Sequence, residues 1–242
     1  MITLPNVQPI EKSEPHPEGL LDVHSVFYTV QGEGPFAGRP AVFIRLAGCN
    51  LQCPLCDTDY TSGRRLLSKF QLIIEVLQQL RGPYQTNHPD RDLIVITGGE
   101  PLRQRLGDFI GTALANFVVQ IETNGTLYDP SLSTLYDHPK LHFVCSPKTP
   151  KVAPEIVRRV DAWKYVISAG QVEADGLPSV TLNGCRPFRP LPLHQYHDKV
   201  YVQPCDEQDP VKNAANTKAA VDSCLRFGYT LCLQLHKIVG LE

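Results

Sequence analysis

The sequence lacks an excess of basic residues, and it lacks any long apolar run. Its 23 lysines and arginines are outnumbered by 25 aspartates and glutamates, which gives a net charge of −2 and a pI near 6.4. Because a nucleic-acid-binding surface normally carries a basic excess, we expect no nucleic-acid partner. No apolar stretch approaches the roughly 20 residues of a membrane-spanning helix, so we expect no membrane partner either.

The sequence also lacks the pattern of a secreted, disulfide-stabilised protein. Its eight cysteines are clustered and unevenly spaced, and no signal-peptide pattern is visible. We therefore expect the protein to work in a reducing cytoplasm. Outside the cluster, the simplest interpretation is a set of buried or incidental thiols: Cys185, Cys205, Cys224 and Cys232.

Three cysteines, Cys49, Cys53 and Cys56, stand in one short segment with the spacing C-x3-C-x2-C. This spacing lets three thiolates converge on one inorganic centre, whereas a closed iron–sulfur or zinc site takes four protein ligands. A cluster held by three cysteines would leave one iron open to a further ligand. A structural zinc site remains the alternative, with Cys145 or His142 as its distant fourth ligand.

Short apolar segments alternate with helical or irregular ones, which predicts a single α/β domain with a mainly parallel sheet over residues 22–242. Residues 1–21 are rich in Pro, Glu and Lys and are expected to form a loose tail. Residues 176–198 interrupt the alternation and are expected to form a surface insertion. The predicted strands are His24–Val30, Ala41–Ala47, Leu93–Thr97, Phe117–Ile121, His142–Cys145, Trp163–Ile167, Lys199–Gln203 and Thr230–Leu235.

Two helices carry clear signals. Ser68 is suited to cap a helix that ends near Gly82, and Pro210–Phe227 forms an amphipathic segment. The apolar positions that we expect the first helix to bury are Phe70, Ile73, Ile74, Leu77 and Leu80.

Polar or glycine-containing motifs follow most of the predicted strands. Because parallel strands present their carboxyl ends at one edge, these motifs should share that edge with the three cysteines. A zinc site offers no reason for such a ring of polar groups, and together the motifs favour an active site. They are Gly98-Gly99-Glu100-Pro101, Glu122-Thr123-Asn124-Gly125, Ser146-Pro147-Lys148, Gln203-Pro204 and His236.

These motifs resemble those of the 7-carboxy-7-deazaguanine synthase family, which consists of radical S-adenosylmethionine (SAM) enzymes. The resemblance runs from Phe27 to the C-terminus and leaves out the tail and residues 176–198. It implies an abbreviated, partly open barrel of parallel strands with flanking helices, and a homodimer. The residues that carry it are Thr29–Gly34, Phe43–Leu46, Cys49–Thr58, Ile96–Pro101, Ile121–Thr126, Ser146–Lys148 and Gln234–Lys237.

The resemblance implies that Cys49, Cys53 and Cys56 hold a [4Fe-4S] cluster whose open iron is chelated by SAM. Radical chemistry then belongs to the cofactors, and the protein supplies placement and exclusion of water. An external electron donor, similar to flavodoxin or ferredoxin, is implied as well. The residues expected to bind SAM are Gly99, Glu100, Glu122, Ser146, Pro147, Lys148, Gln203, Pro204, Cys205 and Asp206.

The implied reaction converts 6-carboxy-5,6,7,8-tetrahydropterin to 7-carboxy-7-deazaguanine by hydrogen abstraction and ring contraction, with loss of ammonia. Mg²⁺ is implied at Thr58, and a hydroxyl plus waters is a plausible ligand set for that ion. The α-carboxylate of Glu242 is expected to accept hydrogen bonds from the pterin edge, which a C-terminal tag would disturb. Substrate contacts are expected from Val30, Gln31, Gly32, Glu33, Arg45, Thr97, His236 and Glu242.

Two alternatives stay open. A glycyl-radical-activating enzyme would share the cysteine loop and the Gly-Gly-Glu turn, but it would not need the Gln31-Gly32-Glu33-Gly34 turn or the Asp57-Thr58 pair. A zinc-stabilised binding module without catalysis would need only the thiols.

Overall fold

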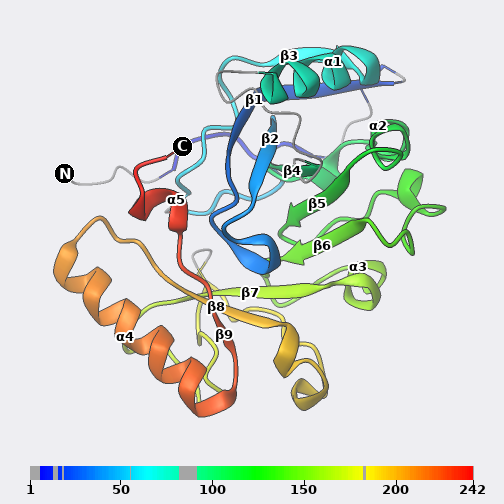
Figure 1. The fold of residues 1–242 in the computed structure, drawn as a ribbon. Helices are drawn as coiled ribbons and strands as arrows, with labels where there is room; N and C mark the ends of the chain where they lie inside the picture. The colour runs from blue at the N-terminus through cyan, green and yellow to red at the C-terminus, as the bar shows by residue number, and fades with distance from the viewer. Residues whose placement is uncertain are drawn as a thin grey trace.

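The computed structural model describes residues 6–12, 16–17, 19–54, 56–81, 92–181 and 184–241. These residues form a nine-stranded sheet in the order β3-β1-β2-β4-β5-β6-β7-β8-β9. Figure 1 shows a curved, open sheet that begins beside α1 and ends beside α4. The predicted α/β class and the partly open arrangement are therefore confirmed.

From β2 onward each strand pairs in parallel with its neighbour, whereas β1 pairs antiparallel with β2 and β3. The first predicted strand exists, but it is antiparallel and begins at Leu20, four residues before the predicted His24. The later predicted strands exist within one or two residues of their expected ends, except the last. The prediction of a strand to Leu235 is wrong, because the chain leaves the sheet after two residues. The strands are β1 Leu20–Val30, β2 Pro40–Leu46, β3 Arg65–Ser68, β4 Leu93–Gly98, β5 Val118–Thr123, β6 Leu141–Cys145, β7 Ala162–Ile167, β8 Val200–Pro204 and β9 Thr230–Leu231.

The helix α4 has the predicted bounds. The side chain of Asp209 accepts hydrogen bonds from two backbone N–H groups of its first turn, and Gly228 ends it in the left-handed conformation. The α-helices are α1 Lys69–Leu80, α2 Gly107–Ala113, α3 Pro154–Arg159, α4 Pro210–Phe227 and α5 Leu235–Ile238. The 3₁₀ turns are η1 Gly34–Phe36, η2 Pro101–Arg103, η3 Pro130–Leu132, η4 Leu193–Gln195 and η5 His197–Lys199.

Helix α1 has the predicted cap, and of its predicted buried face only Ile73 and Leu80 pack against the core. Ser68 and Gln71 form a reciprocal capping box, and the helix buries Leu72 and Val76. The expected core positions Phe70, Ile74 and Leu77 are exposed instead, Phe70 to 66%. A second apolar stripe on the same helix misled the prediction, because periodicity does not tell which of two stripes meets the sheet. Gly82 lies outside the described residues.

The two faces of the sheet have different roles. Trp163 and Tyr165 of β7 pack in the main core with Phe109 of α2 and Ile156 of α3. Residues of β7 alternate between faces, so Lys164 points to the opposite face. That opposite face carries the cavity described below.

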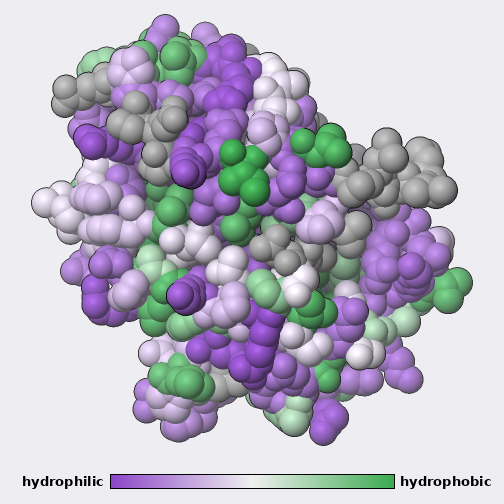
Figure 2. Space-filling view, turned by 180° about the vertical axis from the view of Figure 1, so that it is seen from behind, coloured by the Kyte–Doolittle hydropathy of each residue, from purple (hydrophilic) through white to green (hydrophobic). Residues whose placement is uncertain are grey.

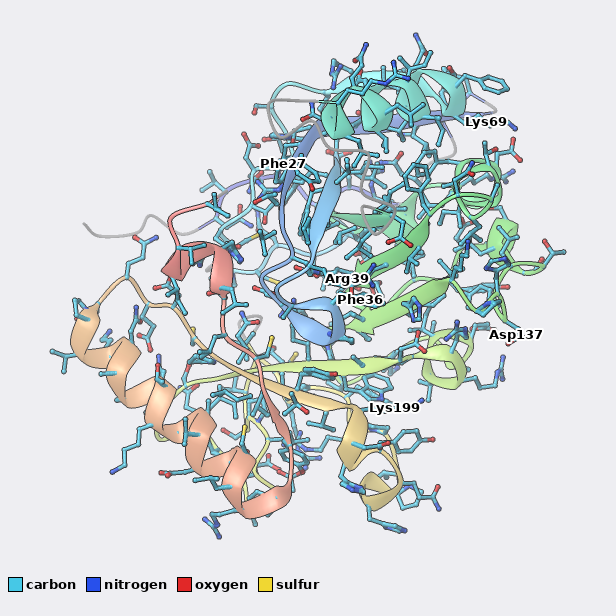
Figure 3. The ribbon with its side chains drawn as sticks, viewed as in Figure 1. Phe27, Phe36, Arg39, Lys69, Asp137 and Lys199 are labelled. Atoms are coloured by element: carbon cyan, nitrogen blue, oxygen red, sulfur yellow. The ribbon has the colours of Figure 1, made fainter. Side chains whose placement is uncertain are left out.

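The turn between β1 and β2 shows how exposed cations pack on this fold. The Arg39 guanidinium lies 5.0 Å from the centre of the Phe36 ring and 2.8 Å from Asp92, and Figure 3 labels both side chains of the stacked pair. Seen from behind in Figure 2, hydrophilic side chains dominate the surface and hydrophobic ones form separate patches. Of the described helices, none is long and apolar enough to cross a membrane.

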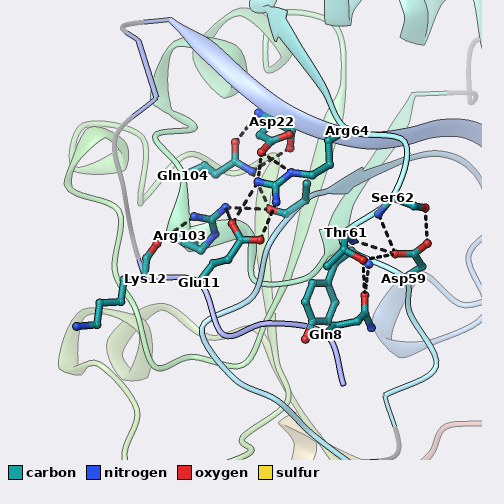
Figure 4. A network of polar contacts seen from close by, with 12 residues as sticks. Gln8, Glu11, Lys12, Asp22, Asp59, Thr61, Ser62, Arg64, Arg103 and Gln104 are labelled. Carbon is teal, nitrogen blue, oxygen red and sulfur yellow. Dashed lines mark hydrogen bonds and ion pairs between the residues drawn. The ribbon is translucent and has the colours of Figure 1, made fainter. Parts of the chain in front are cut away.

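The N-terminal segment differs from the expected loose tail. Residues 6–12 lie along the cysteine loop, with an isolated bridge between Ile10 and Cys49. Arg103 and Arg64 both bind Glu11, as Figure 4 shows. The polar composition of the segment gave no hint of these contacts, which depend on distant partners.

The segment 176–198 also differs from a simple surface insertion. Within its described residues, Leu177 is fully buried and Phe188 packs against the core, where its carbonyl accepts a hydrogen bond from the Tyr165 hydroxyl. The segment therefore contributes to packing, although it carries only short 3₁₀ turns.

Candidate active site

A cavity of about 530 Å³ lies at the carboxyl ends of the parallel strands. Most of the expected site residues line it, although they come from positions 30 to 236 of the chain. Those are Val30, Gln31, Glu33, Arg45, Cys49, Cys53, Cys56, Thr58, Thr97, Gly99, Glu122, Ser146, Lys148, Gln203, Pro204, Cys205, Asp206 and His236. Gly32, Glu100 and Pro147 are not among its lining residues, and Glu242 lies outside the described part of the chain.

The three cysteine thiols face this common cavity and are all free. Burial raises the pKa of each, that of Cys49 to about 12. Thiols in such a setting ionise when a metal centre supplies the compensating positive charge. Among the described residues, no three His, Cys, Asp or Glu side chains converge closely enough for a single metal ion.

The expected fourth zinc ligands do not lie at this cavity. His142 lies 3.8 Å from Asp161 and packs edge-on against Phe36. Cys145 is fully buried, and its sulfur lies against the backbone of Gly125. Neither residue lines the cavity, so the assignment of Cys145 or His142 to a zinc site is wrong.

The Gly98-Gly99 pair allows β4 to pack against the cysteine loop. A Cβ atom at Gly99 would overlap the carbonyl of Gly48, and one at Gly98, whose φ is +118°, would overlap the backbone of Leu46. The Gly99 N–H donates to the Leu46 carbonyl at 3.1 Å. The close packing of β4 against the cysteine loop therefore requires glycine at both positions. Gly99 also lines the cavity.

Glu100 was expected to bind SAM, but it is fully buried behind the cavity wall. Its carboxylate accepts hydrogen bonds from Thr123 Oγ1 at 2.6 Å, Asn124 N at 2.7 Å and Leu102 N at 3.0 Å. Burial raises the pKa of Glu100 to about 7, because it outweighs these hydrogen bonds, which would lower that pKa. Glu100 therefore holds the end of β5 in place, because its acceptors are used by the protein.

Glu122 was expected beside SAM, but it bonds Gln31 of the expected substrate site and a lysine that was not expected at the site. Gln31 Nε2 donates to Glu122 Oε1 at 2.9 Å, and Lys164 Nζ lies 3.2 Å from Glu122 Oε2. Lys164 also donates to Glu33, which accepts a second hydrogen bond from Gln234 at 2.9 Å. The sequence analysis missed Lys164, although a lysine inside the apolar strand Trp163–Ile167 was a visible signal.

The Ser146-Pro147-Lys148 turn is held by residues of the segment 176–198, which the family resemblance does not cover. Lys148 Nζ donates to Ser146 Oγ at 2.8 Å. The carbonyl of Lys148 accepts from Thr181 Oγ1 at 3.0 Å and from the Cys185 thiol at 3.2 Å. Burial and the ammonium of Lys164 lower the pKa of Lys148. The segment 176–198 thus helps to position this wall of the cavity.

His236 belongs to helix α5 rather than to the end of a strand. A Cβ atom at Gly32 would overlap its imidazole ring, and the Leu235 N–H donates to the Gly32 carbonyl at 3.1 Å. Gly32 therefore makes room for His236. Burial lowers the pKa of His236, so the ring is neutral at pH 7 and can serve as donor or acceptor.

Lys237 joins three segments that are far apart in the sequence. Its ammonium lies 3.1 Å from Asp57 beside the cysteine loop and 3.0 Å from Asp206 after β8. Thr58 lines the cavity next to this contact, and its carbonyl accepts a hydrogen bond from Gln8 at 2.9 Å. Arg45 also lines the cavity, with its guanidinium 4.9 Å from the centre of the Phe27 ring.

Comparison with known proteins now decides the family. The chain is 43% identical over 245 residues to a 7-carboxy-7-deazaguanine synthase from Rhodospirillum rubrum, covering 96% of this chain and 97% of that protein. The chain belongs to the 7-carboxy-7-deazaguanine synthase family. Another member, from Rickettsia prowazekii, is 37% identical and covers 92% of this chain and 89% of its own.

The fold agrees with this family. A crystal structure of QueE from Escherichia coli superimposes with a TM-score of 0.62 at 21% identity, covering 90% of this chain and 95% of that chain. No protein-family model matches the chain. The resemblance drawn from the motifs is thus confirmed by similarity over nearly the whole length.

Proposed function

We propose that this protein is a radical SAM lyase that converts 6-carboxy-5,6,7,8-tetrahydropterin to 7-carboxy-7-deazaguanine with loss of ammonia. The observation that carries the proposal is the cavity itself. In a member of this family, the thiols of the cysteine loop line one cavity at the carboxyl ends of the parallel strands. The same cavity is lined by the carboxylates of Glu33 and Glu122, the guanidinium of Arg45 and the imidazole of His236.

The cofactor end of the cavity fits a [4Fe-4S] cluster held by Cys49, Cys53 and Cys56, with SAM alongside. The cluster and SAM would supply the radical that removes a hydrogen from the substrate. The protein residues then hold SAM in place and exclude water. The walls suited to SAM are Gly99, Ser146 and Lys148, and the segment Gln203–Asp206 after β8.

The substrate end of the cavity lies between the cysteine loop and helix α5. Arg45 provides a cation for the substrate carboxylate, because a guanidinium binds carboxylates with two parallel hydrogen bonds. Thr58 provides an oxygen for Mg²⁺, which keeps most of its waters and needs few protein ligands. Glu33 and Glu122 face the same space as His236, so they suit the N–H groups of a pterin.

The remaining parts of the proposal concern partners. All eight cysteines are free, which fits a reducing cytoplasm and an external flavodoxin- or ferredoxin-like donor. A homodimer follows from the family resemblance. Sedimentation of the reconstituted protein at two concentrations would test the homodimer, and a single monomeric species would contradict it.

The deciding experiment is turnover by protein purified without oxygen. Reconstituted protein should be brown and should form a deazaguanine product from SAM, a reductant and the carboxytetrahydropterin, with equimolar ammonia. Boiled enzyme and omission of SAM are the controls. A colourless protein that binds zinc, or a fully iron-loaded protein without product, would contradict the proposal.

A further inference from the structure

A buried cation stands between two carboxylates in the cavity wall. Lys164 of β7 is 7% exposed, and its ammonium contacts Glu33 after β1 and Glu122 of β5. All three residues line the cavity. Lys164 and Val166 point to the cavity from alternate positions of β7, while Trp163 and Tyr165 fill the core on the other face.

The surroundings leave Lys164 as the main charge compensation for this pair of carboxylates. The side-chain amides of Gln120 in β5 and Gln31 in the β1–β2 turn donate hydrogen bonds to Glu122. The side-chain amide of Gln234, near the C-terminus, donates to Glu33. The other titratable groups facing the pair are Lys148, the thiol of Cys232 and the imidazole of His236. Burial lowers the pKa of His236, so it carries no charge at neutral pH.

Burial would by itself raise the pKa of Glu33, but the ammonium of Lys164 and the Gln234 amide outweigh burial and lower that pKa below its usual range. Burial likewise opposes the charge on Lys164, and the two carboxylates outweigh it and raise the pKa of Lys164. Without that ammonium, Glu33 would stand buried near a second carboxylate and would bind a proton more readily. The cation therefore keeps Glu33 negatively charged in this wall.

A buried charge cluster of this kind is a poor way to stabilise a strand, since hydrophobic residues of similar size are often as good or better. Its physical value lies in the two acceptor groups that it fixes. An ionised carboxylate accepts hydrogen bonds only, so two of them in one wall select a ligand edge that carries several N–H donors.

We infer that Lys164 is a positioning residue that holds Glu33 and Glu122 toward the cavity as a pair of hydrogen-bond acceptors, so that the pair recognises the N–H edge of an amino-pyrimidinone ring. The inference rests on the proposed function, because it concerns how the same site selects its substrate. Lys164 acts through the carboxylates and need not touch the substrate.

The test compares Lys164→Met with Lys164→Arg in protein reconstituted without oxygen. Loss of the buried cation should raise KM for the carboxytetrahydropterin by roughly 30-fold or more with a smaller change in kcat. The acid limb of kcat/KM should move up by about one pH unit or more, because Glu33 then binds a proton more readily. Lys164→Arg keeps the charge, so its KM and the acid limb of its kcat/KM profile should stay much closer to those of the wild type.

Two readouts separate positioning from a merely structural role. Iron content should be unchanged in Lys164→Met, and quenching of 6-carboxypterin fluorescence should report weaker binding with the same pH shift. A lower melting temperature with wild-type KM and pH profile would overturn the inference. If wild-type enzyme makes no product, the proposed function fails, and the binding measurement still tests Lys164.

Lys164→Met leaves two buried carboxylates without their cation, and a second pair of variants covers the case in which it does not fold. The pair Glu122→Gln and Glu122→Gln/Lys164→Met then decides, because each has only one carboxylate beside Gln234. The acid limb of 6-carboxypterin binding should lie higher in the double variant than in the single one, since only the single variant keeps the cation. Acid limbs at the same pH in the two variants would overturn the inference.

Discussion

At the scale of single residues, the cavity combines groups whose charge states are set by their neighbours. Burial keeps the thiols of the cysteine loop protonated until a positive centre arrives, and it keeps His236 neutral. Lys164 instead stays charged because two carboxylates surround it. Burial opposes the charged form of all these groups. The thiols and His236 stay uncharged because no partner outweighs burial, whereas Lys164 stays charged because its two carboxylate partners do.

Cys53→Ala should abolish cluster binding and turnover while the fold remains. The reason is that the strands, and not a metal, build the core, and Cys53 is half-buried in a loop outside it. Iron content, the visible spectrum and circular dichroism check the two halves of the prediction. Cys224→Ala is the matched control, since this half-buried thiol of α4 does not line the cavity. SAM cleavage by Cys53→Ala would contradict the ligand assignment.

Thr58→Ala should weaken substrate use without loss of iron. If the Thr58 hydroxyl binds Mg²⁺ beside the substrate carboxylate, its removal should raise the Mg²⁺ concentration for half-maximal rate by roughly tenfold. A magnesium titration at fixed substrate measures this change. Thr217→Ala on the exposed side of α4 should behave as wild type. An unchanged titration would leave Thr58 as a structural residue of the loop.

At the scale of elements, the sequence predicted the parallel strands and α4 well, because their signals are local. Apolar runs buried on both faces identify β4 and β5, and Asp209 with Gly228 marks the ends of α4. The prediction failed where the outcome depends on distant partners. Helix α1 has two apolar stripes, and only the sheet decides that Leu72 and Val76 turn inward.

The N-terminal segment is the element whose role the sequence concealed. Asn6 and Gln8 donate to the carbonyls of Cys53 and Thr58, while the Glu11 N–H donates to that of Cys49. Gln8 also accepts a hydrogen bond from the Tyr60 N–H at 2.8 Å, beside the contacts of Thr61 that Figure 4 shows. Polar composition predicts a tail, but here the polar groups satisfy the backbone of the cysteine loop.

The double variant Asn6→Ala/Gln8→Ala should loosen the cysteine loop. Each of the two lost hydrogen bonds to loop carbonyls removes about 1 kcal/mol, so the loop should open roughly 30-fold more often. Hydrogen exchange of residues 49–60 in the apo protein and the rate of iron release to a chelator both measure this opening. Val7→Ala is the control, because this side chain is 83% exposed. Unchanged exchange in the double variant would show that the segment merely rests on the loop.

At the scale of the whole molecule, the cavity exists because the sheet brings lining residues from positions 30 to 241 of the chain to one edge. The order of strands and the rule that ligands bind at their carboxyl ends were enough to predict this gathering from the motifs. The rule could not predict that Glu100 turns behind the wall or that Glu122 pairs with Lys164. Side-chain partners across the sheet depend on strand curvature and register, which no local pattern contains.

Lys237 is the clearest case of such long-range assembly, because one ammonium joins the cysteine loop, the end of β8 and helix α5. Burial would lower its pKa, but hydrogen bonds to Asp206 and the charge of Asp57 outweigh burial and raise it, so the contact persists at neutral pH. Lys237→Met should free α5, displace His236 and raise KM for substrate by roughly fivefold, the scale of a partly exposed ion pair.

Steady-state kinetics at low and high salt check this prediction, because the wild-type contact should weaken with salt and the variant should not. Lys237→Arg should recover most of the affinity, and iron content should be the same in all forms. Lys69→Met is the matched control, since Lys69 pairs with Asp108 at 3.9 Å and neither residue lines the cavity. If Lys237→Met keeps the wild-type KM and salt dependence, the three segments hold together without this cation, and packing of Gly32 against His236 alone positions the imidazole.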